Sequence, residues 1–483
     1  MNIAYSFIRY YQVRSELKEM RFSIALFMGL ATALTSVAQY KIEVNIDGLA
    51  DNEVYLGYHL GQSKYIEDTA AMNEGKAIFQ GEEELTHGIY FIYTPNYFLE
   101  LVITEEQQFQ LSSNTTDPLQ AKKVEGSRQN EIFHQFQLKL AETQSKSNEL
   151  KAGLESAQSR EDTVAIYEKI QAVEVANKEF QDQLAAENPD SYVAAFLNLI
   201  RKPADVEAPE GLSEQEVRQY KFQSYKDRFF DGIDFTYEGM LRTPLFQDRI
   251  IEYVDRLTSP EPDSLIATAD FLIGKAEPNP DVFRYILVTL TNKFSKPKLM
   301  GHDAVFVHLA ENYYLTGKAT WATEEMIENF TTAVNDLKPN LIGEVAPSLQ
   351  LLDTTLSPIS LNDIVADYTV LFFYDPDCGH CKKMAPVALD FYHQYRAEGV
   401  ETIGVCIATD MDKWKKFVYE KGLDWINGAD PYFQSNFRKE YNILSTPTIY
   451  ILDRDKKIIG KRIGVEQLSD FIDVRLRIDA GTD

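Results

Sequence analysis

The feature that most constrains this chain is a pair of cysteines, Cys378 and Cys381, set between an apolar run and an expected helix. Residues 370–374 are all large and apolar or aromatic, which predicts a buried strand. If Cys378 begins the following helix, its sulfur meets the positive end of the helix dipole and free backbone N–H groups. These favour the thiolate, the nucleophile of disulfide exchange, and the spacing lets Cys381 close back on Cys378. The stretch therefore predicts a redox-active disulfide.

The N-terminus resembles a secretory signal. Met20 and an arginine precede an apolar run over residues 22–34, and small residues lead to Ala38. We expect cleavage after Ala38, with translation starting at Met1 or Met20. No later stretch approaches the roughly 20 apolar residues of a membrane span, so we expect an exported protein of the periplasm or cell envelope without a span after signal cleavage. With only 3 cysteines in 483 residues, the chain does not depend on structural disulfides.

Composition bounds the class of protein. The chain is 44% hydrophobic and 12% aromatic, which supports packed cores in roughly two to four domains. Its formal net charge of −26 argues against nucleic-acid partners, because these attract basic surfaces.

The pattern along the chain predicts three folded regions after the signal segment of residues 1–38. Residues 39–120 alternate apolar and polar side chains between turn signals, which predicts an antiparallel β-sandwich-like domain. Residues 121–341 carry helical periodicity, which predicts long polar-faced helices that begin with a hairpin, and this region reveals no chemistry. Residues 342–483 alternate strands and helices, which predicts an α/β domain with a mixed sheet covered on both faces.

Within the last region the expected strands and helices follow from local pattern. Two short extended pieces at 346–353 and 359–361 come first, and strands are expected at 370–374, 400–408, 448–452 and 458–463. Helices are expected from Cys378 to about 395, and at 411–420, 432–441 and 465–476. Cys406 is expected to pack as a small buried hydrophobe, and Trp414 and Trp425 to pack near the domain surface.

Four motifs carry a family resemblance: Cys378-Gly-His-Cys381, Ala385-Pro386, Ser445-Thr446-Pro447-Thr448 and the opening Ala346-Pro347. Together they resemble the thioredoxin superfamily, and the opening segment resembles its envelope branch, the TlpA/ResA-type thiol–disulfide oxidoreductases. The whole arrangement is similar to exported thioredoxin-like proteins of Gram-negative bacteria that carry an N-terminal β domain and a helical middle region. The resemblance implies a thioredoxin fold and a protein-disulfide oxidoreductase.

The resemblance also implies roles for single residues. Cys378 would be the attacking nucleophile and Cys381 the resolving thiol, while Pro447 would follow a cis peptide beside the sulfurs. Gly379 and Thr446 would meet the substrate, and His380 would tune the thiolate. No cofactor and no metal are implied. The partners would be protein thiols or disulfides and an unidentified envelope redox partner.

Two positions depart from the family pattern. Thioredoxins place a buried acid where this chain has Phe372, and ResA-type proteins place a glutamate where it has Met384. The usual proton acceptor for the resolving cysteine is therefore missing, and only Asp375, Asp377 and His380 are close in sequence. The direction of electron transfer stays open.

Three other interpretations remain open. The cysteines could belong to a structural zinc site with Cys406 and His380 or His393, although no second closely spaced pair exists. Thiol-dependent peroxide reduction is a second, but peroxiredoxins have a threonine where Asp375 stands. In the third, the chain is an envelope interaction module with a vestigial or accessory thioredoxin domain.

Overall fold

The computed structural model describes residues 38–157 and 159–481, and the expected signal peptide lies outside the described residues. The chain divides into two compact units. As far as it is described, the first holds residues 38–157, 159–259 and 268–289, and the second holds residues 260–267 and 290–481.

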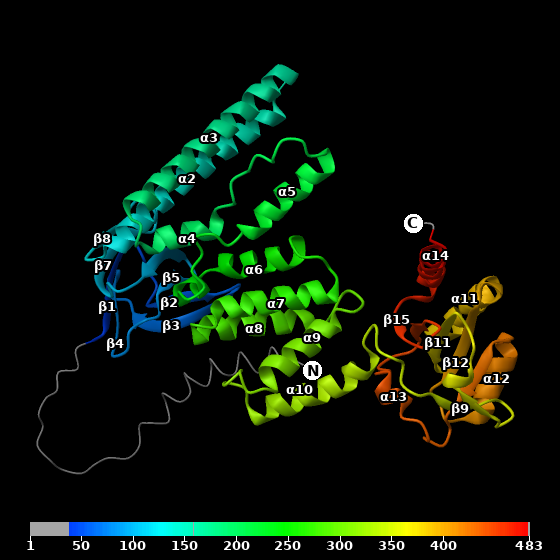
Figure 1. The fold of residues 1–483 in the computed structure, drawn as a ribbon. Coiled ribbons are helices and arrows are strands. Elements are labelled where there is room, and N and C mark those ends of the chain that lie inside the picture. Colours follow the sequence, from blue (N-terminus) through cyan, green and yellow to red (C-terminus); the bar gives the residue numbers. More distant parts are fainter. Residues whose placement is uncertain (1–37, 158, 482–483) are drawn as a thin grey trace, which may run out of the picture. The chain divides into compact units, whose positions relative to one another are not determined.

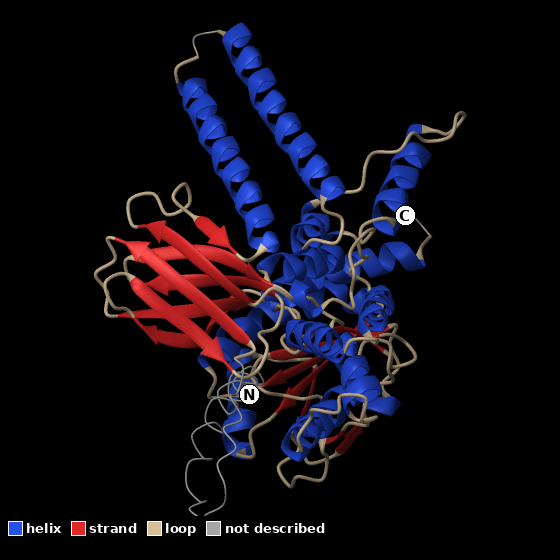
Figure 2. Cartoon of the chain, turned by 90° about the vertical axis from the view of Figure 1, so that its left-hand side faces the viewer, coloured by secondary structure: helices blue, strands red, loops and turns tan. Residues whose placement is uncertain are grey.

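The first unit opens with a two-layer β domain, shown by the large group of red arrows at the left of Figure 2. One sheet has the order β4-β1-β7-β8 and the other has the order β3-β2-β5-β6. The strands are β1 (Tyr40–Asp47), β2 (Glu53–Leu60), β3 (Ser63–Ala71), β4 (Lys76–Gly81), β5 (Gly88–Thr94), β6 (Tyr97–Ile103), β7 (Gln108–Asn114) and β8 (Lys123–Glu125). Apolar side chains of both sheets share one core, as the period-two pattern predicted. The sandwich-like domain is confirmed, with one difference: β1 and β7 pair in parallel.

Helices follow the β domain in the first unit. The predicted hairpin is formed by α2 (Arg128–Glu155) and α3 (Arg160–Glu187), which lie side by side in Figure 1. Ser127 and Ser159 cap them by accepting hydrogen bonds from the backbone of Asn130 and Asp162. The base of α2 is fixed to β6, because the Asn130 side chain accepts from Val102 N at 2.9 Å and donates to Val102 O at 2.7 Å.

Shorter helices complete this region. They are α4 (Tyr192–Ile200), α5 (Glu214–Asp227), α6 (Pro244–Arg256), α7 (Pro262–Ala276) and α8 (Pro280–Phe294), with the short turn η1 (Glu238–Arg242) before α6. Residues of α7 and α8 are divided between the two units.

The second unit contains helices before its sheet. These are α9 (Asp303–Leu309), the π-helical turn η2 (Ala310–Tyr314), α10 (Glu324–Leu337) and η3 (Lys338–Asn340). Residues 290–341 belong to the same compact unit as the following α/β fold.

The α/β fold is built on a seven-stranded mixed sheet of order β10-β9-β13-β12-β11-β14-β15. Its strands are β9 (Gln350–Leu352), β10 (Pro358–Ser360), β11 (Tyr368–Tyr374), β12 (Val400–Cys406), β13 (Ile426–Ala429), β14 (Thr448–Leu452) and β15 (Ile458–Lys461). Every residue of β11 is buried, because it lies inside the sheet with parallel β12 on one side and antiparallel β14 on the other.

Two separate cores cover the two faces of this sheet, as predicted. One contains Phe372 and Tyr374 with side chains of α11 (Gly379–Tyr395), α12 (Met411–Lys421) and α14 (Leu468–Asp479). The other contains Leu371 and Phe373 with residues around α13 (Phe437–Glu440). The short turns η4 (Leu361–Asp363), η5 (Arg396–Glu398) and η6 (Val465–Gln467) join the elements.

The prediction of a helix over residues 432–441 was largely wrong. The expected helix at 432–441 is reduced to α13, and β13 was not predicted. The buried Asp430 carboxylate accepts hydrogen bonds from the backbone of Gln434 at 2.9 Å and Ser435 at 2.8 Å. Phe433 also adopts a φ of 53°, which a helix excludes. These interactions hold the first part of the segment as a loop.

Within the described ranges, none of the helices combines the length and the apolar character that a membrane crossing requires.

Candidate active site

The two cysteines lie at the start of α11, directly after the carboxyl end of β11. Cys378 is the N-cap residue, and its sulfur accepts a hydrogen bond from the backbone N–H of Cys381 at 3.3 Å. Cys378 is partly exposed and Cys381 is buried, and both are free thiols. The predicted helix-start position of Cys378 is confirmed.

Their surroundings separate the two thiols in acidity. Partial burial raises the pKa of Cys378, but hydrogen bonds with Cys381, with the Thr446 side chain and with the backbone of His380 outweigh it and place that pKa below its ordinary value. Burial raises the pKa of Cys381 to about 11, and the neighbouring Cys378 adds to this. The exposed sulfur is thus the one that ionises first, which is the order a nucleophile and a resolving thiol require.

A second loop meets the first cysteine from the other side of the site. The Thr446–Pro447 peptide bond is cis, as the resemblance implied. The Thr446 carbonyl oxygen accepts a hydrogen bond from the Cys378 thiol at 3.3 Å. Residues far apart in the sequence are thus brought together around one sulfur.

The glycine and histidine between the cysteines face outward. Both Gly379 and His380 are exposed, and a Cβ added to Gly379 would meet nothing within 4 Å. The surface beside the Cys378 sulfur is therefore open.

The nearby acids are engaged in local structure. The Asp375 carboxylate accepts a hydrogen bond from the Asp377 backbone N–H at 2.7 Å. The backbone carbonyl of Asp375 accepts one from the Cys378 backbone N–H at 3.1 Å. Asp377 is exposed and forms an ion pair with Lys413 at 2.7 Å. Both acids thus shape the loop before the helix.

The two positions that depart from the family pattern are apolar in three dimensions. Phe372 is fully buried, with its ring 5.7 Å from the rings of both Tyr374 and Trp425. Met384 is partly buried against the core that contains Cys381. Neither position offers a proton acceptor.

A buried hydrogen bond behind the cysteines was not predicted. Trp414 donates from Nε1 to the Tyr374 hydroxyl at 2.7 Å, and both side chains are fully buried. The expectation that Trp414 and Trp425 lie near the domain surface was wrong, because both pack inside the core over β11. Only the aromatic character of these residues gave a signal in the sequence.

The third cysteine is a packing residue, as expected. Cys406 is fully buried at the end of β12, opposite Tyr374, and burial raises the pKa of its thiol to about 12. In the part of the chain that the structure describes, no three His, Cys, Asp or Glu side chains are grouped so that they could hold a metal ion.

Comparisons with known proteins fit this geometry. Residues 342–461 match the AhpC/TSA family, and residues 40–133 match a domain of unknown function, DUF4369. The thiol-disulfide oxidoreductase ResA of Bacillus thuringiensis subsp. konkukian is 29% identical over 138 residues, which are 27% of this chain and 76% of that protein. ResA of Bacillus subtilis is 25% identical over 117 residues, which are 24% of this chain and 64% of that protein.

Two solved structures are also similar to parts of this chain. A domain of a possible thiol-disulfide isomerase from Cytophaga hutchinsonii is 38% identical, with 30% of this chain and 97% of that chain covered and a TM-score of 0.28. A thioredoxin-like protein from Bacteroides caccae is 17% identical, with 57% of this chain and 99% of that chain covered and a TM-score of 0.44.

The sheet order, the Cys-Gly-His-Cys helix start and the facing Thr446-Pro447 loop define a thioredoxin-like domain. Over this domain the chain is similar to the AhpC/TSA family and to ResA-type thiol-disulfide oxidoreductases, which supports the enzyme class of the thioredoxin-like oxidoreductases.

Proposed function

We propose that this protein exchanges disulfides with protein substrates through Cys378 and Cys381. The observation that carries the proposal is the placement of the Cys378 sulfur, which lies at the N-terminus of α11 within reach of the Cys381 N–H and the Thr446 carbonyl. A partly exposed sulfur with a lowered pKa sits above a buried one with a raised pKa. This is the arrangement that a dithiol needs for attack followed by resolution.

The proposed disulfide exchange has two steps. The Cys378 thiolate attacks one sulfur of a substrate disulfide, a mixed disulfide forms, and the departing substrate thiolate takes up a proton. The Cys381 thiol then loses its proton and attacks the Cys378 sulfur, which releases the second substrate thiol and leaves a Cys378–Cys381 disulfide. Two electrons pass from the dithiol to the substrate, and the reverse sequence oxidises a substrate dithiol.

The remaining roles belong to the same proposal. Gly379 and Thr446 would contact the substrate backbone, since both adjoin the Cys378 sulfur and the surface at Gly379 is open. Pro447 would shape the loop that presents Thr446, and His380, when protonated, would stabilise the Cys378 thiolate.

We place this activity in redox homeostasis of the cell envelope, after export by the N-terminal signal and with an envelope redox partner. We also propose that the chain is organised as an N-terminal signal segment (1–38), a β-rich domain (39–120), a helical region (121–341) and a thioredoxin-like domain (342–483).

Cysteine variants test the proposal. With insulin as the protein disulfide and a supplied dithiol, Cys378→Ser should abolish catalysed reduction, and Cys381→Ser should accumulate a mixed disulfide with the substrate. Cys406→Ala is the matched control and should keep wild-type activity. Full activity of Cys378→Ser would refute the proposal, and rapid peroxide consumption by the wild type would favour the peroxidase alternative.

The reduction potential of the Cys378–Cys381 couple would assign the direction. A value near about −270 mV would indicate a thioredoxin-like reductant, and one near about −120 mV an oxidant.

A further inference from the structure

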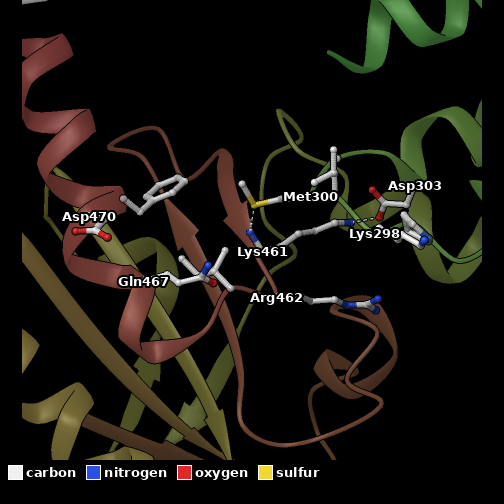
Figure 3. Close-up of a pocket in the computed structure, with 12 residues that line it drawn as sticks. Lys298, Met300, Asp303, Lys461, Arg462, Gln467 and Asp470 are labelled. Atoms are coloured by element: carbon white, nitrogen blue, oxygen red, sulfur yellow. Dashed lines mark hydrogen bonds and ion pairs between the residues drawn. The ribbon is translucent and has the colours of Figure 1, made fainter. Parts of the chain in front are cut away.

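A pocket of about 600 Å³ lies in the second unit between the loop that precedes α9 and the last strand of the sheet. Leu299 and Met300 supply apolar lining from the loop, and Ile463 and Phe471 supply it from the chain after β15. Figure 3 shows the pocket with Met300 on the loop side, Asp470 on α14 and Lys461 between them.

A buried ion pair fixes the loop beside the strand. The Lys461 ammonium pairs with the Asp303 carboxylate, and both side chains are almost fully buried. The same ammonium donates to the Asn340 carbonyl at 2.8 Å. The helical segment before the sheet is thereby held against β15, so the walls of the pocket are built into the fold.

The floor of the pocket is the outer edge of β15 at Lys461; nearer the start of the strand the same edge is paired, because Ile458 exchanges hydrogen bonds with Gly343 and Glu344. β15 is the last strand in the sheet order, and the Arg462 N–H points inward to the Ile449 carbonyl at 2.7 Å. The neighbouring Lys461 N–H therefore points outward, where it donates to the Met300 sulfur at 3.1 Å. A thioether is a weak acceptor, and a carbonyl of an added extended peptide would satisfy this N–H better.

β15 pairs with β14, and β14 begins two residues after Thr446 of the proposed active site. Ile449, which accepts from Arg462, follows Thr446 by three residues, and the Thr446 carbonyl is 3.3 Å from the Cys378 sulfur. The three residues from Thr446 to Ile449 span at most about 11 Å and adjacent strands lie about 4.8 Å apart, so we estimate that roughly four or five residues of extended substrate separate Cys378 from the pocket floor.

We propose that this pocket is a specificity subsite that takes an apolar side chain from an extended segment of the protein substrate, a few residues from its reactive cysteine. The inference rests on the proposed function and assigns a substrate-selecting role to the 297–301 loop. Charges of both signs, Lys298, Arg462 and Asp470, line the pocket, so charge does not select the ligand. The apolar lining and the strand edge do.

The test compares two synthetic peptides with a small disulfide. Each peptide carries one cysteine, capped as a disulfide with 2-mercaptoethanol, and has either leucine or aspartate at the fourth and fifth residues on both sides. The small substrate is 2-hydroxyethyl disulfide, which does not reach the pocket. Wild type should prefer the leucine peptide by at least about tenfold in kcat/KM, since one apolar group in a pocket contributes roughly 10–200-fold.

Two variants place a charge in the pocket. Leu299 and Met300 are 56% and 43% exposed, so Leu299→Glu and Met300→Glu should fold. Each should reduce the preference to near unity and leave kcat/KM for 2-hydroxyethyl disulfide unchanged. Val474→Glu is the matched control, because Val474 is 43% exposed on α14 and is not among the residues lining the pocket. It should keep the wild-type preference.

The outcomes separate this inference from the proposed function. Equal turnover of both peptides by the wild type, or an equal loss toward all three substrates in Met300→Glu, would overturn the subsite. Absence of activity toward every disulfide would instead overturn the proposed function. Fluorescence anisotropy with cysteine-to-serine versions of the labelled peptides then tests the pocket without redox chemistry: stronger binding of the leucine peptide supports the subsite, and equal binding refutes it.

Discussion

Replacing Asp303 by alanine should strongly destabilise the second unit. Asp303 and Lys461 have side chains only 5% and 4% exposed, and they form the ion pair beside β15. In Asp303→Ala the Lys461 ammonium keeps its hydrogen bonds to the Asn340 carbonyl at 2.8 Å and to the Asn340 side-chain oxygen at 3.2 Å, but it has no countercharge. Removing one partner of a buried pair costs about 3–5 kcal/mol, and we expect a loss of that size.

A double variant distinguishes the unpaired charge from loss of packing. In Asp303→Leu combined with Lys461→Met, no charge remains to be desolvated, and such replacements are often neutral. Asn340 then loses its donor, which costs about 1–3 kcal/mol. The double variant should therefore be more stable than Asp303→Ala.

Tryptophan fluorescence during urea unfolding measures the free energy of unfolding of the second unit. All 3 tryptophans, Trp321, Trp414 and Trp425, belong to the second unit. Glu311→Ala is the control, because Glu311 pairs with Lys338 at the surface and loss of such a pair costs less than about 1 kcal/mol. If Asp303→Ala costs no more than Glu311→Ala at an unchanged m-value, the reasoning is refuted.

Three further predictions concern titration and the missing acid. The rate of alkylation by iodoacetamide should rise with pH, with a midpoint below the ordinary thiol pKa for Cys378 and near pH 11 for Cys381. Equal reactivity of the two cysteines, measured by mass spectrometry, would contradict this. Burial lowers the pKa of Lys122 to about 7, against about 10.4 when unfolded. At pH values between these two pKa values the unfolded chain binds more protons than the folded chain. The unfolding free energy of the first unit, measured by circular dichroism, should therefore rise from pH 7 to 9, and Lys122→Met should remove this rise. Met384→Glu adds a base beside the buried thiol and should raise kcat for insulin reduction by about tenfold at pH 7, whereas Met384→Gln should not.

Local pattern was sufficient for the elements that position the cysteines. The apolar run before Cys378 marked a strand buried on both faces, and the two-residue spacing marked a helix start. The loop of Thr446 and Pro447 was placed by family resemblance, because no local signal relates it to Cys378.

Contacts between segments that are distant in the sequence could not be predicted from local pattern. The helix expected at 432–441 failed because the Asp430 carboxylate captures backbone N–H groups that a helix would use. Trp414 was expected near the surface because its partner, Tyr374, lies on another element. The Asp303–Lys461 pair gave no signal either, since each residue alone looks like an ordinary surface charge.

The hairpin of α2 and α3 has a mechanical consequence. Each helix has 28 residues, and at 1.5 Å per residue the hairpin extends about 42 Å. Asn130 fixes its base to Val102 of β6, while the buried side chains of α3 are only Ile170, Leu184 and Ala185. The hairpin is thus a lever with a fixed pivot: a tilt of about 10° at the base would move its far end by about 7 Å.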